Sequence, residues 1–533
     1  MRYARDMFWA DRIAGEVEAR FGDLSKGGLK RPLVVRDEKT ASGRVHVGSM
    51  RGVMIHGMVS QALKDRGIDN TFLYEINDTD PMDGFPVYLP EEFKKYMGFP
   101  LFRIPSPDGI AKNFADYFAS EFKQVIESSG FTPTFYNVSE LYLSGKMDDS
   151  IREALTHAGE IRRIYKEVSG SQKPENWYPL SVICEQCGKV GTTRVTDFDG
   201  TEVTYVCEPR AVEWAQGCSH TGKVSPFGGN ATLPFKVEWP AKWKVMGVDI
   251  EGGGKDHSTK GGTRDVGGHI AREIFHHEPP FDIPYEFFLV GGKKMSSSKG
   301  RGSSAREVAD LLPPKIFRLA VLSKDINQAI NFDPEGDTIP VLYDLYDKLA
   351  EGYVATKDDD YARLFSLVHV GPVPQSGFLP RFSQVAFVVQ MPHMQLQNEM
   401  EKLKGSPLTE AEKAEVEERA LYAKRWLELY APEKFVFKLQ DSLPEAAKSL
   451  SDMQKKALGM LAQYVQSAEA MPSGEELHHF LHGLKDSVPI APGELFKAIY
   501  TVFLAKESGP KAGWFLSSLD RALVVKLLAE AIG

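Results

Sequence analysis

A histidine and two glycines stand where the chain passes from an expected strand to an expected helix. Gly43, His46 and Gly48 follow the apolar residues 33–35 and lie around the start of a helix-like stretch that runs from about His46 to Gly67. The start of a helix attracts phosphate, because its first N–H groups are unpaired and its dipole is positive there. His46 can donate to a phosphate leaving group, and glycines let the backbone approach it closely. A purely structural role for these residues is the alternative.

Three lysines share a second segment, which is rich in glycine and serine. Lys293, Lys294 and Lys299 lie within residues 293–300, around a Met-Ser-Ser-Ser run. Lysines over a triphosphate can offset the charge that develops as the bond between its α and β phosphates breaks. A solvated basic loop is the alternative for this segment alone.

The four cysteines of the chain cluster in the pattern C-x2-C-x19-C-x10-C. Four cysteines are too few for a disulfide scaffold in a chain of this length, and their clustering suggests a metal site. The thiolates of Cys184, Cys187, Cys207 and Cys218 suit tetrahedral Zn²⁺. The wide last spacing makes His220 a rival fourth ligand. Free cysteines without metal are the alternative.

A parallel sheet is the element that would position these segments. Residues 33–35 and 71–76 read as buried strands joined by the helix-like stretch, an order typical of parallel α/β sheets. The N-D-T-D sequence at 77–80 follows the second strand, where it could face a ligand crevice or cap a turn. Further strands are expected at 243–250 and 285–290, and helices at about 111–129, 139–143, 148–168 and 265–276.

Changes in composition divide the chain into three parts: residues 1–290, 291–344 and 345–533. The first contains an insertion at about 110–236, whose part at 180–236 is β-rich and holds the cysteines. After about residue 340, apolar residues recur at helical spacing with few glycines. The expected fold class is α/β, with a parallel sheet, a small zinc-bearing β insertion and an all-α C-terminal domain.

The overall composition is that of an ordinary globular protein, with 533 residues, 42% of them hydrophobic. The net charge of −9 excludes a strongly basic coat for nucleic acid. A local basic surface is compatible with it, since residues 290–330 carry eight Lys/Arg and three Asp/Glu. The sequence predicts no membrane span, and its N-terminus reads as an amphipathic helix rather than a signal peptide. We expect a monomer in the cytoplasm.

The first two segments together resemble the H-I-G-H and K-M-S-K-S signatures of class I aminoacyl-tRNA synthetases. They read H-V-G-S at 46–49 and K-M-S-S-S-K at 294–299. Within that class, the chain is similar to the class I lysyl-tRNA synthetases over nearly its full length. The other segments that carry this resemblance are T-x-S-G-x-x-H-V-G at 40–48, E-N-W-Y-P at 175–179, V-E-W-P-A-K-W at 237–243, G-V-D-I-E-G-G-G-K-D-H at 247–257 and G-P-K-A-G-W-F-L-S-S-L-D-R at 509–521.

The resemblance implies a Rossmann-type catalytic domain, a junction that carries the lysine loop, and a helical anticodon-binding domain. It implies that lysine and ATP, with Mg²⁺, form lysyl-adenylate, and that lysine then passes to the 3′-terminal adenosine of tRNA(Lys). His46, Lys294 and Lys299 are the implied catalytic residues. The implied ATP-binding residues are Ser42, Gly43, His46, Gly48, Gly254, Asp256, Lys294, Met295, Ser296 and Lys299. Those implied near the amino acid are Thr40, Trp239, His257 and Tyr285, with core packing as the alternative for Trp239 and Tyr285.

Three positions depart from the family pattern. The first signature ends in Ser49, where the family often has asparagine. In the second signature, Ser297 stands at the position of the second lysine of K-M-S-K-S, and Lys299 lies two residues later. Glu38 stands where glycine is expected. We hypothesise that Glu38 takes part in recognition of the substrate's amine.

The RNA contacts and the exact activity have alternatives. Trp426, Tyr430 and Trp514 in the helical domain could stack on RNA bases or only pack helices. A class I synthetase of another specificity, such as a glutamyl-like enzyme, is one alternative function. A non-charging RNA-binding or amino-acid-sensing paralogue is the other.

Overall fold

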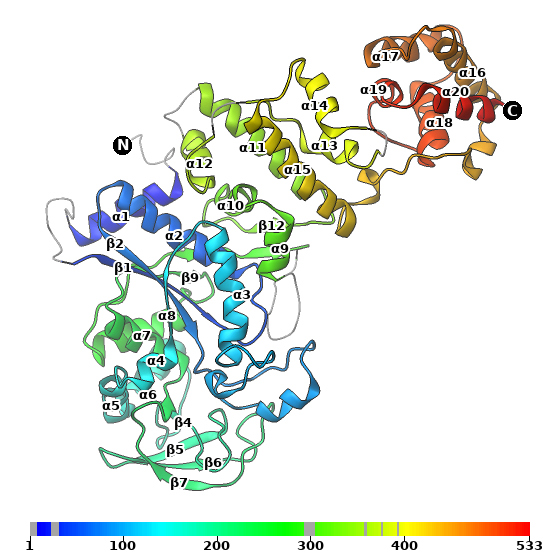
Figure 1. Ribbon diagram of the computed structural model, residues 1–533. Helices are drawn as coiled ribbons and strands as arrows, with labels where there is room; N and C mark the ends of the chain where they lie inside the picture. The colour runs from blue at the N-terminus through cyan, green and yellow to red at the C-terminus, as the bar shows by residue number, and fades with distance from the viewer. Residues whose placement is uncertain (1–7, 23–30, 293–303, 356–359, 375–376, 392–393) are drawn as a thin grey trace. The chain divides into compact units, whose positions relative to one another are not determined.

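The computed structural model describes residues 8–22, 31–292, 304–355, 360–374, 377–391 and 394–533 (Figure 1). The chain forms two compact units. One consists of Met1–Phe332 with Ala355–Val373, and the other of Asp333–Val354 with Pro374–Gly533. Among the described residues, no helix has both the length and the apolar character needed to cross a membrane.

Three parallel strands form the central sheet of the first unit. Their order is β1 (Leu33–Thr40), β2 (Asn70–Asn77) and β3 (Thr134–Asn137). Single parallel bridges join Val35 to Ile250 and Ile250 to Phe281, and so extend the sheet beyond β1. The expected α/β fold class is confirmed, because β1 and β2 are parallel and joined through a helix.

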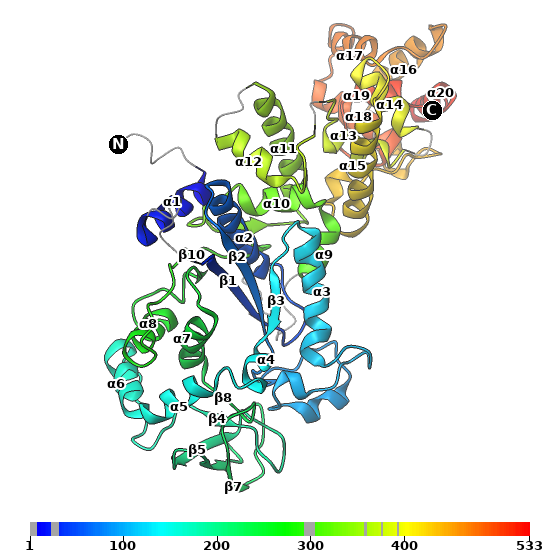
Figure 2. The same ribbon diagram turned by 60° about the vertical axis from the view of Figure 1, so that its left-hand side comes forward.

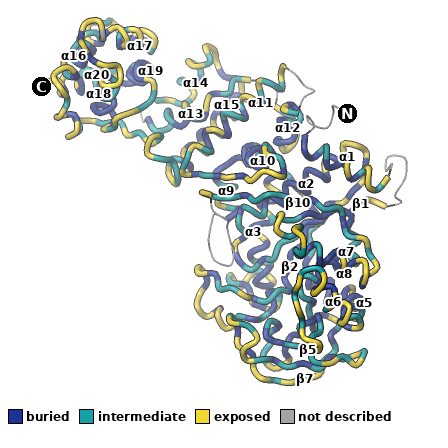
Figure 3. Tube along the Cα trace, turned by 180° about the vertical axis from the view of Figure 1, so that it is seen from behind, coloured by how far each residue is buried: buried dark blue, intermediate teal, exposed yellow. Residues whose placement is uncertain are grey.

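The connecting helix α2 (Ser49–Asp65) is buried almost all round, as Figure 3 shows. It contacts β1 and β2 on one side, and α1 (Trp9–Phe21) and α10 (Pro314–Leu322) also contact it. A helix that is apolar all round must be covered by other elements. Gly57 permits one close approach, since a Cβ there would lie 2.3 Å from the Phe131 ring.

The prediction of a strand at 243–250 is wrong. Residues up to Met246 belong to helix α7 (Phe235–Met246), which ends at Gly247 in a left-handed conformation with φ of 60°. Only Ile250 pairs in the sheet. The strand expected at 285–290 is instead two short strands with different partners. They are β10 (Pro284–Tyr285), parallel to β9 (Gly253–Gly254), and β11 (Phe288–Val290), parallel to β12 (Ile330–Phe332).

The cysteine-bearing insertion is β-rich, as expected (Figure 2). Its antiparallel strands are β4 (Ser181–Val182) with β8 (Ala231–Thr232), and β5 (Thr193–Phe198), β6 (Val203–Cys207) and β7 (Thr221–Val224). The remaining helices of the first unit are α3 (Phe114–Ser128), α4 (Val138–Leu143), α5 (Asp148–Thr156), α6 (Ala158–Ser169), α8 (Thr263–Glu273), α9 (Ala305–Leu311) and α12 (Asp360–Val368).

The regular elements in the described part of the second unit are all helices. Several helices begin with a serine or threonine whose side chain accepts from the backbone three residues on, as at Thr409, Ser451 and Ser473. Its helices are α11 (Thr338–Ala355), α13 (Phe382–Val388), α14 (Leu396–Lys404), α15 (Glu410–Leu429), α16 (Asp452–Ser467), α17 (Gly474–Gly483), α18 (Pro492–Leu504), α19 (Ala512–Ser517) and α20 (Arg521–Ile532).

Candidate functional site

The loop predicted to bind phosphate lies between β1 and α2 and is anchored by its backbone. His46 lies three residues before Ser49, the first residue of α2, and bridges to Ser304. The Val45 carbonyl accepts from the amide of Ala305 at 2.8 Å. The loop amide of Arg44 donates to the Tyr88 hydroxyl at 2.6 Å. These contacts fix the path of a loop whose Ser42 and His46 side chains remain half-buried.

The amides at the start of α2 are not the open donors that the sequence suggested. Those of Ser49, Met50 and Arg51 donate to the carbonyls three residues before them. Gly48 is the N-cap, without a capping side chain. An anion at this end would therefore meet the helix dipole rather than unpaired amides of Ser49 to Arg51.

The glycine run after Ile250 lies where backbone segments meet closely. A Cβ on Gly252 would stand 2.1 Å from the Ile283 carbonyl oxygen, so a side chain there would require the backbone to move. Gly254 lies in β9, and the exposed Asp256 holds its carboxylate beside it: a Cβ on Gly254 would be 2.8 Å from Asp256 Oδ1. The second predicted segment, with Lys294, Met295, Ser296 and Lys299, lies outside the described residues.

Trp239 and His257 lie together in an aromatic group. Phe235 and Trp239 stack, with ring centroids 5.4 Å apart and an interplanar angle of 14°. The ring of His257 meets Trp239 edge-on at 5.9 Å. Trp239 is only 3% exposed, yet its indole N–H has no protein acceptor. Buried donors are nearly always paired, so this N–H is available to a ligand.

Tyr285 belongs to a neighbouring group at the start of α2. A Cβ on Gly52 would lie 2.6 Å from the Tyr285 hydroxyl and 2.7 Å from Asp37 Oδ2. Burial raises the pKa of Asp37 to about 8. In the same group, His56 Nε2 accepts from the Gly252 amide at 2.7 Å, while Nδ1 lies 2.8 Å from the Gly52 carbonyl oxygen. His56 therefore links α2 to the glycine run in one neutral tautomer, and burial lowers its pKa to about 4.

Glu38 lies in a buried network of ions between β1, β2 and α7. Arg36 donates to Glu38, Glu75 and Glu251, at 2.5, 2.5 and 2.8 Å. Lys242 donates to Glu38 at 3.0 Å, to Glu75 at 2.5 Å and to Glu238 at 3.2 Å. Two cations thus meet four carboxylates. Buried charge of one sign attracts a further ion of the opposite sign.

Glu38 is the member of this network that solvent reaches. Its side chain is 17% exposed, whereas those of Arg36, Glu75 and Lys242 are 0% exposed. Burial raises the pKa of Glu38 to about 8, against the pull of Lys242 and Arg36. Glu75 is also desolvated, but Arg36 and Lys242 hold its pKa at about 2. Glu38 is therefore the carboxylate of this network that gains or loses its proton near neutral pH.

Thr40 and the acidic residues after β2 are held by hydrogen bonds. The Thr40 hydroxyl donates to Asp80 at 2.7 Å, and burial raises the pKa of Asp80 to about 6. Asp78 accepts from the backbone and the hydroxyl of Ser139 at 2.8 and 2.5 Å. Asp78 thus caps the start of α4. Of the two roles that the sequence left open, facing a ligand crevice or capping, this contact is of the capping kind.

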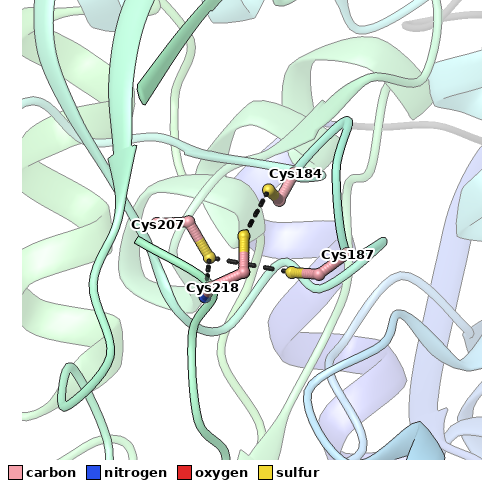
Figure 4. A group of neighbouring side chains, drawn as sticks. All are labelled: Cys184, Cys187, Cys207 and Cys218. Carbon is pink, nitrogen blue, oxygen red and sulfur yellow. Dashed lines mark hydrogen bonds between the residues drawn. The ribbon is translucent and has the colours of Figure 1, made fainter. Parts of the chain in front are cut away.

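The four cysteines converge from two segments of the insertion, 184–187 and 207–218 (Figure 4). Their sulfur atoms all lie within 4.8 Å of one another. Sγ of Cys184 is 3.6 Å from that of Cys218, and Sγ of Cys187 is 3.7 Å from that of Cys207. Four sulfurs at about 2.3 Å from one Zn²⁺ would be about 3.8 Å apart, so these thiols fit the metal. His220 lies outside the group and packs against Tyr205, at 5.9 Å between ring centroids.

Sequence reasoning missed the partners of Glu38. Arg36 and Glu75 are charged residues inside buried strands, and Glu238 and Lys242 share one face of α7 at a spacing of four. A charge within an apolar strand pattern was the available signal. Their convergence needs tertiary structure, because Glu38 and Lys242 are 204 residues apart.

The sequence matches a family of known proteins. A family model described as "tRNA synthetases class I (K)" matches residues 7–371. A lysine–tRNA ligase of Methanosarcina barkeri is 34% identical over 99% of this chain and 98% of its own. One of Archaeoglobus fulgidus is 32% identical over 99% of this chain and 100% of its own. The solved structure of a glutamate tRNA ligase from Elizabethkingia meningosepticum is 13% identical, with a TM-score of 0.42, and covers 94% of this chain and 99% of that one.

Proposed function

Because the chain belongs to the family of class I tRNA synthetases (K), we propose that it is a lysine–tRNA ligase. It activates lysine with ATP to lysyl-adenylate, releases pyrophosphate and transfers the lysyl group to the 3′-terminal adenosine of tRNA(Lys). The observation that carries the proposal is the match to lysine–tRNA ligases along essentially the whole chain. ATP brings Mg²⁺ with it, and a monomer acting in the cytoplasm completes the proposal.

In this proposal, Glu38 accepts a hydrogen bond from an ammonium group of lysine. The support is the excess of carboxylates over cations around it and its exposure relative to the other members. We place Trp239 and His257 beside the side chain of lysine, because an aromatic face suits its methylenes. The unpaired indole N–H of Trp239 would meet an acceptor of the substrate. Thr40 and Tyr285 complete the proposed amino-acid site.

The chemistry of activation requires positioning and charge stabilisation rather than a protein nucleophile. The lysine carboxylate attacks the α-phosphorus of ATP in line, and pyrophosphate leaves. We assign His46 and the loop of Ser42, Gly43 and Gly48 to the phosphates, and Gly254 and Asp256 to the adenosine. From the other segment, we assign Lys294 and Lys299 to the departing pyrophosphate, and Met295 and Ser296 to the binding of ATP.

For the insertion, we propose a structural Zn²⁺ held by Cys184, Cys187, Cys207 and Cys218. The support is the mutual approach of their sulfur atoms. Zinc with four thiolate ligands has no open position for a substrate, so it would stabilise the fold of the insertion rather than take part in catalysis.

Pyrophosphate exchange measured with each amino acid in turn tests the proposed activity. We expect ATP–pyrophosphate exchange that depends on lysine and not on glutamate. Exchange driven by glutamate would favour the glutamyl-like alternative. No exchange with any amino acid, with or without tRNA present, would favour the non-charging alternative.

A further inference from the structure

His56 is a fully buried histidine in the middle of α2, the helix that follows the loop proposed for the phosphates. A polar ring inside an apolar helix costs free energy unless its nitrogens are paired. Here both are paired with the backbone: Nδ1 is 2.8 Å from the Gly52 carbonyl oxygen, and Nε2 is 2.7 Å from the Gly252 amide nitrogen. The activation of lysine as proposed uses neither nitrogen, so the ring serves another purpose.

The direction of these two hydrogen bonds follows from the chemistry of the groups. The Gly252 amide can only donate, so Nε2 of His56 accepts, and the proton of the neutral ring lies on Nδ1, which donates to the Gly52 carbonyl. Burial lowers the pKa of His56 to about 4, so the ring is neutral at physiological pH and Nε2 stays an acceptor. Asp37 Oδ2 is 3.7 Å from Nδ1, which is beyond hydrogen-bond distance.

The glycine run at 252–254 depends on its backbone partners, because it has no side chains to pack and glycine is conformationally permissive. The amides on either side of the run, at 251 and 255, donate to carbonyls within residues 281–285 at 3.0 and 2.9 Å. The Gly252 amide is paired by α2 instead, through His56. The run is therefore held from two sides, and His56 provides one of them.

The hydrogen bond from Gly252 to His56 joins two segments that are both assigned to ATP. The loop at 42–48 precedes α2 and is assigned to the phosphates, whereas Gly254 and Asp256 are assigned to the adenosine. His56 and Gly252 are 196 residues apart in the chain, so its local turns cannot fix the distance between these segments. The two parts of ATP are covalently joined, and therefore the segments that bind them must keep a constant separation.

A binding site keeps its geometry when residues behind it hold the segments that touch the ligand. We propose that His56 is a positioning residue for ATP, which holds the glycine run at the required separation from the phosphate loop. This inference rests on the proposed ligase function, from which the two ATP-binding segments are assigned. It adds a residue that touches neither ATP nor lysine and acts through the Gly252 amide.

Two substitutions in the full-length chain separate the two hydrogen bonds of His56. In His56→Gln, the amide oxygen reaches the position of Nε2 and can accept from Gly252, whereas the shorter side chain of His56→Asn reaches only the position of Nδ1. We expect His56→Asn to raise the KM for ATP about ten-fold, because the glycine run loses its partner and ATP must restore its path. His56→Gln should keep the KM for ATP close to that of the wild type. The KM for lysine should stay near the wild-type value in both variants, since these hydrogen bonds go to Gly52 and Gly252 and not to the residues proposed for lysine.

Ser60→Ala is the matched control, because it also removes a buried hydrogen bond from α2. Ser60 is 4% exposed, and its hydroxyl donates to Asn70 Oδ1 of β2 at 2.6 Å rather than to the glycine run. Both Ser60→Ala and His56→Asn should lower the melting temperature, but only His56→Asn should raise the KM for ATP. A purely structural role of His56 would lower the melting temperature without separating the KM for ATP from the KM for lysine.

Titration calorimetry with ATP alone separates this inference from the proposed function, because it requires no charging activity. ATP should bind His56→Asn about ten-fold more weakly than the wild type, and His56→Gln with nearly wild-type affinity. If His56→Asn did not fold, His56→Met would give the same test, since it fills the buried space without an acceptor. Wild-type ATP affinity in the variant without an acceptor, or an equal rise in the KM for lysine, would overturn the positioning role. If the wild-type chain bound ATP but showed no exchange with any amino acid, the ligase proposal would fail while ATP binding still decided the role of His56.

Discussion

Glu38 is the most exposed carboxylate of the buried ion network between β1, β2 and α7. Its partners Arg36 and Lys242 are already shared with Glu75, Glu238 and Glu251. In the proposed lysine site, an approaching ammonium would therefore meet a carboxylate that its neighbours only partly neutralise. Binding of that ammonium also favours the ionised form of Glu38, whose pKa burial has raised.

Glu38→Gln should raise the KM for lysine about ten-fold or more and leave the KM for ATP unchanged, because a charged hydrogen bond becomes a neutral one. In the wild type, the KM for lysine should fall as pH rises through about 8, since Glu38 becomes ionised over that range. The variant should lose this pH dependence. Steady-state pyrophosphate exchange between pH 6.5 and 9 measures both effects.

Glu153→Gln is a matched control. Glu153 pairs at 2.7 Å with Lys244, which belongs to the same helix α7 as Lys242, but this pair is accessible to solvent. It should behave as wild type. An unchanged lysine KM in both Glu38→Gln and Glu38→Gly would exclude Glu38 from amine recognition.

Among elements, α7 shows what the sequence could and could not predict. Its last residues look like a strand because they are apolar and end at a glycine, yet they complete a helix. The repeat of Trp239 and Trp243, and of Glu238 and Lys242, at a spacing of four was the helical signal. Strands β1 and β2 and helix α2 were predictable, because a local apolar run and the chain's own turns determine them. The partners of each charge were not, because they come from distant segments.

The cysteine-bearing insertion gives the prediction at the scale of an element. Purified under reducing conditions, the chain should contain about one Zn²⁺, measured by elemental analysis. Cys207→Ser should remove the metal and lower the melting temperature, because Cys207 is buried and its sulfur contacts that of Cys187 and accepts from the Cys218 amide. His220→Gln is the control, since His220 lies outside the sulfur cluster, and it should retain the metal. Zinc lost equally in both variants would contradict the four-cysteine site.

For the whole molecule, the net charge of −9 is the balance of 64 Lys and Arg against 73 Asp and Glu, so RNA would have to meet a local basic surface. Residues 290–330 contain eight Lys and Arg, but in the part of this segment that the structure describes, two of the arginines are already engaged within the protein. Arg318 is buried and donates to the carbonyls of Ser129 and Leu367, and Arg306 pairs with Asp310. These arginines stabilise the fold rather than offer free positive charge to RNA.

The division into two units predicts that stability can be lost in one of them alone. In the second unit, Arg419 of α15 is 0% exposed and donates to Asp347 of α11 at 2.5 Å and to Glu415 at 2.8 Å. Arg419→Met leaves both carboxylates without their cation, and should destabilise this unit by about 3 kcal/mol. Arg381→Met is the control: it removes a pair with Asp344, also on α11, whose arginine is 64% exposed, and should cost less than about 1 kcal/mol.

Scanning calorimetry and activity at increasing temperature would measure the effect of Arg419→Met. Each unit has its own buried core, so the variant should show an earlier transition that belongs to the second unit. Between that transition and the next, lysine-dependent pyrophosphate exchange should persist while tRNA charging falls, because the residues proposed for activation belong to the first unit and the helices proposed to bind the anticodon belong to the second. A single transition, at which exchange and charging are lost together, would show that the units unfold as one and that tRNA recognition cannot be removed by unfolding alone.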